Sequence, residues 1–172
     1  MSNLVEPKTL YLDEGPDVPN NPVLPVLIYR QVLGEDGDDM ARGFEERFAE
    51  NGWRGTWRNG IFSYHHFHPD AHEALGIACG SVEVQLGGER GKRLRLEAGD
   101  LVVLPAGTGH RNLSASDDLL VIGSYPAGQE DYTTSRTKTD RNAVAQVPLP
   151  QSDPFYGSEG PLPRVWNSPA EG

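Results

Sequence analysis

The sequence has little cysteine, few basic residues and no long apolar run. Its single cysteine, Cys79, cannot form an internal disulfide framework, which is typical of a reducing compartment, so we expect the protein in the cytoplasm. Lys and Arg number 15 against 25 Asp and Glu, so the surface repels nucleic acid and anionic lipid. Apolar runs such as residues 119–122 fall far short of the roughly 18 residues that a membrane helix needs. We therefore expect neither nucleic-acid nor membrane partners.

The middle of the chain is poor in proline. Twelve of the 14 prolines lie in the first 25 or the last 47 residues, which disfavours regular helix and central strand at both ends. No basic stretch leads into an apolar run near the start, so we expect no secretory signal. Both ends still carry large apolar side chains, too many for a disordered tail. We expect extended arms that pack on a central barrel.

Hydrophobic periodicity changes once along the chain. Acidic residues and apolar residues at helical spacing predict a helix over 38–51, with Gly52 as its stop. Beyond it a period of two predicts short strands at 60–68, 73–79, 82–86, 93–96, 101–104 and 119–125. This pattern favours an all-β barrel or sandwich over alternating β and α units. With 172 residues we expect one domain, with the N-terminal arm and helix at 1–54, the barrel at about 55–127 and the C-terminal arm at 128–172.

All five histidines lie within residues 65–110, a clustering that surface composition does not explain. His66 and His68 are two apart on the strand expected at 60–68, so their side chains share a face and can bind one metal ion. His65 points the other way. Two further interpretations of this short pattern stay open, namely a hydrogen-bonded network in the core and exposure on a loop.

The strand expected at 73–79 supplies a fourth candidate. Glu73 shares its face with apolar residues and with Cys79, so we expect its side chain to point into the core, where Cys79 is a small packing residue. A buried carboxylate is costly unless it is paired or coordinated. Two imidazoles and a carboxylate form a common shell for Fe, Mn, Ni, Zn or Cu. His72, on the opposite face, is expected to point away from the core, but the sequence leaves open whether it replaces or supplements Glu73.

A second segment, residues 99–110, consists of a strand of buried type, a turn with Pro and Gly, and His110. The turn can direct His110 back towards the sheet. Taken alone, the segment also fits a hairpin with an incidental histidine.

Together the two segments resemble the two motifs of the cupin superfamily. The first motif is matched by Gly60, His66, His68, Glu73 and Gly80, and most of the second by Gly99, Pro105, Gly107 and His110. One departure is Ser114, at a position where cupins commonly have Asn. The resemblance implies a double-stranded β-helix barrel, of the jelly-roll type, with a divalent metal held by His66, His68, Glu73 and His110.

The wider sequence is similar to the YjlB-type single-domain cupins. The similar segments are residues 18–22, 51–53, 57–61, 154–157 and 160–162. This resemblance implies no particular reaction.

A metal site of this kind predicts a metal-dependent enzyme, an oxygenase or an isomerase, that acts on a small organic molecule. Two alternatives stay open, namely a binding or sensor protein without turnover and a metal that only stabilises the fold. Tyr64 and Asn112 share faces with the expected ligands and are candidates for substrate contact. Arg58 and Arg111 are weaker candidates for an anionic ligand.

The opposite face of the strand at 73–79 carries the small residues Ala74, Gly76 and Ala78, which suit close approach by another chain or arm. With the proline-rich arms and the cupin resemblance, this face predicts a homodimer. His72 would then lie near the interface.

Overall fold

The computed structural model describes residues 4–34 and 37–167, so the outermost parts of both expected arms, 1–3 and 168–172, lie outside the described residues. The strands are β1 (Lys8–Leu10), β2 (Val26–Tyr29), β3 (Trp53–Asn59), β4 (Glu73–Cys79), β5 (Ser81–Leu86), β6 (Lys92–Glu97), β7 (Leu101–Leu104), β8 (His110–Ala115) and β9 (Leu120–Pro126). The helices are α1 (Gly37–Glu50), α2 (Arg141–Val144) and α3 (Pro161–Asn167).

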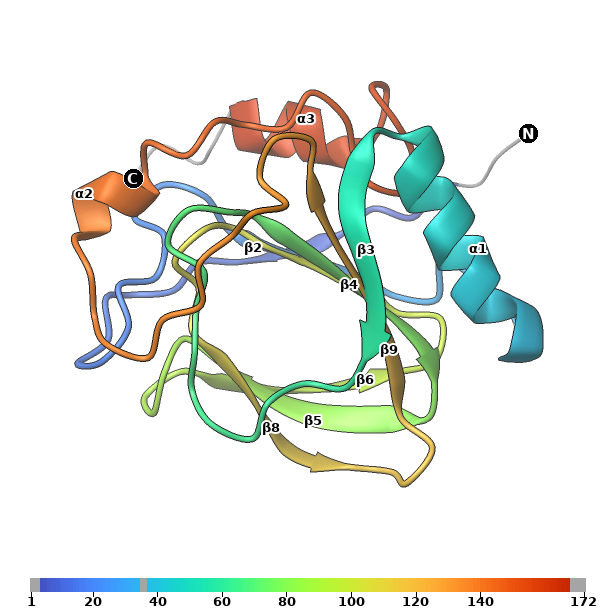
Figure 1. Cartoon of the computed structure of the whole chain (residues 1–172), viewed down its shortest axis with the longest axis horizontal. Helices are drawn as coiled ribbons and strands as arrows, with labels where there is room; N and C mark the ends of the chain where they lie inside the picture. The colour runs from blue at the N-terminus through green and yellow to red at the C-terminus, as the bar shows by residue number, and fades with distance from the viewer. Residues whose placement is uncertain (1–3, 35–36, 168–172) are drawn as a thin grey trace.

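The strands form two antiparallel sheets. The larger has the order β1-β2-β7-β4-β9-β3 and the smaller the order β6-β5-β8. Figure 1 shows the smaller sheet below the larger one, with α1 and α3 on the outer side of the larger sheet. This arrangement confirms the expected all-β jelly-roll barrel.

Alternation along the strands divides the core into two layers. Leu75 and Ile77 of β4 point between the sheets, where they join apolar side chains of both. Ala74 and Ala78 point outward and pack with α1, α3 and β2. Each layer removes apolar side chains from water, which is the main favourable contribution to folding.

Helix α1 covers the small-residue face of β4. Ala41, Phe44 and Phe48 recur at helical spacing and are buried there, and Gly52 follows the helix with a φ of 82°, as the sequence predicts. A Cβ on Gly76 would lie 2.6 Å from the Phe44 ring, so glycine permits this close approach. Because the chain's own helix occupies this face, the face does not support a dimer contact. The homodimer stays a prediction.

The expected strand at 60–68 is wrong. The regular strand β3 ends at Asn59, and residues 60–72 form an irregular segment with isolated bridges only, from His66 to His110 and from Phe67 to Ser135. The period-two pattern could not separate a strand from an extended segment that pairs at single residues.

The terminal segments also differ from extended arms. β2 is a central strand between β1 and β7, and Pro25 lies just before it, where no ladder hydrogen bond is lost. Helix α3 begins at Pro161 and contains Pro163, because proline is tolerated in the first turn, where the backbone N–H has no helical partner.

Cys79 is not a core residue. The pairing of β4 with β9 shifts register between Ile77 and Cys79, and this bulge breaks the alternation on which the expectation depended. The thiol is partly exposed and donates to Asp118 Oδ2 over 3.5 Å.

Within residues 4–34 and 37–167, no helix combines the length and apolar character that crossing a membrane requires.

Candidate metal centre

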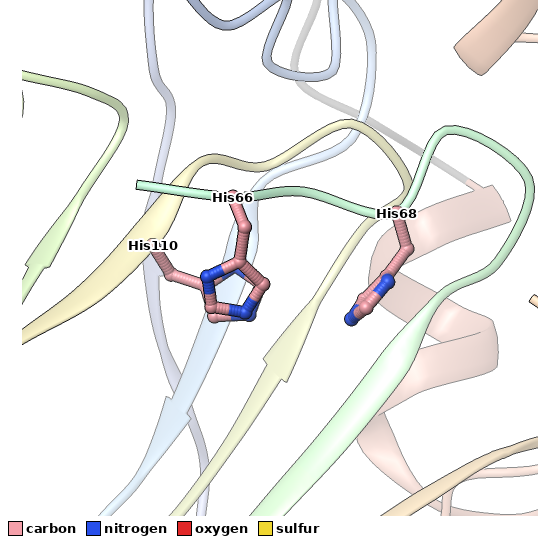
Figure 2. A group of neighbouring side chains, drawn as sticks. All are labelled: His66, His68 and His110. Carbon is pink, nitrogen blue, oxygen red and sulfur yellow. The ribbon is translucent and has the colours of Figure 1, made fainter. Parts of the chain in front are cut away.

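Three buried histidines come together at one end of the barrel. A ring nitrogen from each of His66, His68 and His110 lies within 4.8 Å of those of the other two. His110 begins β8, and His66 pairs with it through two backbone hydrogen bonds, of 2.9 and 3.2 Å. Figure 2 shows His66 and His68 projecting from the same side of their segment towards the His110 ring. Local pairing thus preserves the alternation that the sequence indicated, although the segment is not a regular strand.

Backbone carbonyls fix which nitrogen of each ring carries the proton. Nδ1 of His66 lies 3.1 Å from the carbonyl oxygen of Tyr64, and Nδ1 of His110 lies 2.9 Å from that of Thr108. Nδ1 of His68 lies 3.0 Å from the carbonyl oxygen of Thr133. A carbonyl only accepts, so each Nδ1 donates and each neutral ring keeps a lone pair on Nε2. This is the tautomer that metal-binding histidines need.

Glu73, at the start of β4, completes the cluster. Its carboxylate is buried, and Oε1 lies 3.3 Å from Nε2 of both His68 and His110. Oε1 is a buried polar atom without a hydrogen-bond partner among the described residues. A buried carboxylate oxygen in this position is unfavourable unless a cation neutralises it.

The two 3.3 Å separations suit a shared ion better than a shared proton. Charge-assisted hydrogen bonds between nitrogen and oxygen are typically about 2.7–2.9 Å long. Two ligand atoms each about 2.1 Å from one ion lie about 3.0–3.4 Å apart for ligand angles between octahedral and tetrahedral. The residues present therefore fit a divalent metal ion.

Electrostatics within the cluster are strongly coupled. Burial, with a smaller contribution from His110, lowers the pKa of His66 to about 3. Burial opposes the charged forms of His68 and Glu73, but their mutual attraction outweighs it, so the pKa of His68 is raised and that of Glu73 is lowered. A metal cation between His68 and Glu73 would attract the carboxylate in place of the proton on the histidine ring.

The second oxygen of Glu73 is held by Tyr125, which is held in turn by Trp57, and the sequence alone assigned neither residue to the site. The hydroxyl of Tyr125 donates to Oε2 over 2.7 Å and accepts from Trp57 Nε1 over 2.7 Å. Burial and the Glu73 carboxylate raise the pKa of Tyr125, so its hydroxyl stays protonated. Alternation along β9 could have placed Tyr125 inside the barrel.

The C-terminal arm reaches the same site. Besides the Thr133 carbonyl, Thr134 Oγ1 lies 3.3 Å from Nδ1 of His68, and the ring of Tyr132 stacks on Tyr125 with centroids 4.1 Å apart. No sequence pattern predicts that residues 132–134 lie beside the first motif, because only the fold brings them there.

A cavity of about 440 Å³ opens onto the cluster. Its walls are mainly apolar and aromatic, and the four proposed ligands line it. An ion held by these four residues would face the cavity, whereas protein ligands fill the shell in closed structural metal sites.

The other candidates from the sequence lie outside this cavity. Tyr64 stacks on Phe62 at its edge and carries Arg136 over its ring, 4.0 Å from the centroid. Asn112 pairs with Val84 across β5 and β8 and does not line the cavity. Substrate contact by Tyr64 or Asn112 stays a prediction.

The two arginines are engaged elsewhere. Arg58 forms hydrogen bonds of 2.8 Å to both carboxylate oxygens of Glu45 on the surface. Arg111 donates from Nε to Gln85 over 3.1 Å. Neither lines the cavity, so neither provides the positive charge that an anionic ligand would need there.

His72 is not part of the site, and it lies on the face opposite Glu73, away from the barrel interior, as the alternation predicts. Its side chain is fully buried on the outer layer of β4, against Trp166, and its Nδ1 accepts a 2.9 Å hydrogen bond from the Ala106 backbone N–H. This bond holds the turn that leads to His110, so His72 supports the site from behind.

Sequence comparison identifies the family. Residues 57–122 match the family model of the cupin domain. Over 165 residues the chain is 36% identical to the uncharacterized protein YjlB of Bacillus subtilis (strain 168), covering 94% of this chain and 97% of YjlB.

Solved structures with the same fold are more distant. An acireductone dioxygenase from Bacillus anthracis, with cadmium in its active centre, is 18% identical, with a TM-score of 0.43 and 60% of this chain and 79% of that chain covered. A DUF861 family protein from Thermotoga maritima is 22% identical, with a TM-score of 0.36 and coverage of 58% and 98%. Similarity at this distance carries no information about reaction or ligand. The match across 57–122 and the near full-length relationship to YjlB show that this chain belongs to the cupin family.

Proposed function

We propose that the protein is a metal-dependent enzyme, of the oxygenase or isomerase type, that acts on a small organic molecule. His66, His68, Glu73 and His110 would hold a divalent ion. Such an ion supplies Lewis-acid or redox chemistry when it is bound. The protein's own residues hold the ligands in place and shape a mainly apolar cavity beside them.

The observation that carries the proposal is the environment of Glu73 Oε1. This buried oxygen has no hydrogen-bond partner among the described residues, and Nε2 of His68 and of His110, each with a lone pair when its ring is neutral, lies 3.3 Å away. Three acceptors that face one another without a proton or a cation would repel. A divalent ion between them removes that repulsion and accounts for all three positions.

Supporting contacts leave each ligand little freedom. Carbonyls of Tyr64, Thr108 and Thr133 fix the three rings, and Tyr125 occupies Glu73 Oε2, which leaves Oε1 to face the ion. Partners of this kind typically change metal affinity by about 10–100-fold when removed. A site held this firmly beside a cavity supports a role in binding or chemistry, rather than in stability alone.

Elemental analysis of tag-free protein, purified without added metal, tests the ligand set. We expect near-stoichiometric metal in the wild type and in His72→Gln, and its loss in His110→Gln. His72→Gln is the matched control, because it replaces a buried histidine outside the cluster and its amide oxygen can still accept the hydrogen bond from the Ala106 backbone N–H. Thermal unfolding of all three proteins verifies that each is folded.

The identity of the retained metal determines which activity is assayed next. Iron directs it to oxygen uptake, and zinc, manganese or nickel to isomerisation. A wild type that holds no metal and takes up none of Fe, Mn, Ni, Zn or Cu would overturn the proposal. Equal metal in wild type and His110→Gln would overturn the ligand assignment.

A further inference from the structure

We infer that the cavity binds a planar aromatic molecule that presents one negatively charged oxygen to the metal, in preference to a small dicarboxylate. This inference rests on the proposed function and names the substrate class of the same site. Three features of the cavity carry it: its aromatic walls, the charge at its base and the neutral groups at its rim.

The walls suit a flat ring. The apolar and aromatic residues lining the cavity are Trp57, Ile61, Phe62, Leu75, Tyr125 and Tyr132. Hydrogen bonds hold Trp57 and Tyr125 in place, and Tyr132 stacks on Tyr125 with an interplanar angle of 28°. Fixed aromatic surfaces favour stacked or edge-on contacts with a planar ligand. The volume of about 440 Å³ leaves room for a substituted ring.

The charge at the base limits the charge of the ligand. A divalent ion with three neutral imidazoles and the Glu73 carboxylate has one net positive charge, which one negative oxygen neutralises. A second carboxylate would place an unpaired negative charge among apolar walls. None of the described residues that line the cavity is Lys or Arg, so no side chain there can pair with it.

The rim is open and polar without being charged. Phe62 is 51% exposed at the entrance, and Asn59 and Thr134 are the neutral polar residues of the lining. The guanidinium of Arg136 lies over the ring of Tyr64, which does not line the cavity. The entrance therefore supplies hydrogen bonds to a neutral substituent and no site for a second anionic group.

Calorimetric titration of the zinc-loaded protein with catechol and with oxalate tests the inference, since zinc cannot oxidise the catechol. We expect catechol to bind at least about tenfold more tightly than oxalate. Tyr132→Ala removes one aromatic wall and should weaken catechol about tenfold while leaving oxalate nearly unchanged. Asn59→Arg adds a cation at the exposed rim and should strengthen oxalate binding alone. Leu149→Ala, an exposed change outside the cavity, is the control and should alter neither.

The outcomes separate the two proposals. A protein that takes up no zinc overturns the proposed function and this inference with it. A zinc-loaded protein, verified by elemental analysis after the titration, that binds oxalate more tightly than catechol overturns this inference alone. Equal weakening of both probes by Tyr132→Ala would also overturn it, because the ring would then contribute only to the structure of the site.

Discussion

Gly123 makes room for an aromatic wall of the cavity. It lies opposite Trp57 in the pairing of β3 with β9, and a Cβ at this position would lie 2.2 Å from carbons of the indole ring. The indole donates to Tyr125, which donates to Glu73. The absence of one side chain on β9 therefore allows the contacts that orient a carboxylate of the metal site.

We expect Gly123→Ala to displace Trp57 and to lower the free energy of unfolding by about 1–3 kcal/mol, the usual cost of overpacking. Urea unfolding followed by tryptophan fluorescence measures both effects. Gly60→Ala is the matched control, because a Cβ on Gly60, which also lines the cavity, meets no atom within 4 Å. Equal stability of the two variants would contradict the role given to Gly123.

At the scale of single residues, the sequence predicts the four proposed metal ligands but not the residues that hold them in place. Alternation pairs His66 with His68 and directs Glu73 inward, the cupin resemblance adds His110, and the structure brings the four together. Tyr132 and Thr133 come from a distant segment, so nothing local indicates their place. His72 shows the converse, because parity places it on the outer face of β4 but cannot reveal that Trp166 covers it there.

At the scale of elements, the C-terminal arm is anchored by one buried carboxylate. Asp153 accepts four hydrogen bonds, from the Tyr29 hydroxyl at 2.5 Å and from the backbone N–H groups of Phe155, Tyr156 and Leu162 at 2.8–3.1 Å. These bonds join β2 to the loop before α3 and to the start of that helix. The arm that supplies Tyr132 and Thr133 to the metal site is thus tied to the sheet beyond them.

Tyr29→Phe should lower the free energy of unfolding by about 1.5–3 kcal/mol at neutral pH, the usual range for a hydrogen bond to a charged group. Burial and the Asp153 carboxylate raise the pKa of Tyr29 well above its ordinary value. The stability that this bond provides is therefore complete below about pH 10, where unfolded tyrosine ionises, and is lost as the pH rises further.

Urea unfolding of wild type and Tyr29→Phe between about pH 7 and pH 11 measures this difference. Other tyrosines titrate in both proteins, so subtracting one stability from the other isolates Tyr29 to a first approximation. A difference that grows as the pH rises would refute the assignment, since that sign requires a lowered pKa.

The sequence predicted best the helix and those strands whose hydrophobic pattern runs along the whole element. It predicted least well the segment that pairs with its neighbours at single residues only. The helix over 38–51 and the strands from 73 to 104 appear with nearly the expected bounds. The proline positions wrongly excluded regular helix and central strand at both ends of the chain. A proline just before a strand or within the first turn of a helix does not prevent either element. Residues 60–68 alternate as a strand does, yet pair with neighbours at single positions only.

At the scale of the whole molecule, the two apolar layers support the barrel without the ion. One layer fills the space between the sheets and the other joins the larger sheet to α1 and α3. The metal cluster lies at one end of this frame and adds few apolar contacts to it. A chain of 172 residues can fold on burial of this kind, without a metal.

Removing the metal should lower the melting temperature without unfolding the protein. With free metal at about 100 times its dissociation constant, binding contributes about 2.7 kcal/mol, which corresponds to about 5–10 °C for a domain of this size. Thermal unfolding with and without chelator, followed by circular dichroism, measures the shift. His110→Gln should show none. Loss of the β-sheet signal at room temperature on chelation would show instead that the ion is required for the fold.

Two contacts from the C-terminal arm also bear on when, during synthesis of the chain, the metal site can form. They are the carbonyl of Thr133, next to His68, and the bridge between Phe67 and Ser135. All four proposed ligands are synthesised before residue 133, yet a nascent chain that ends at His110 lacks the group that holds the His68 ring. On the proposed function, the complete site therefore forms only after the ribosome has made the arm. Firm binding of the ion would then follow the synthesis and docking of residues 133–135.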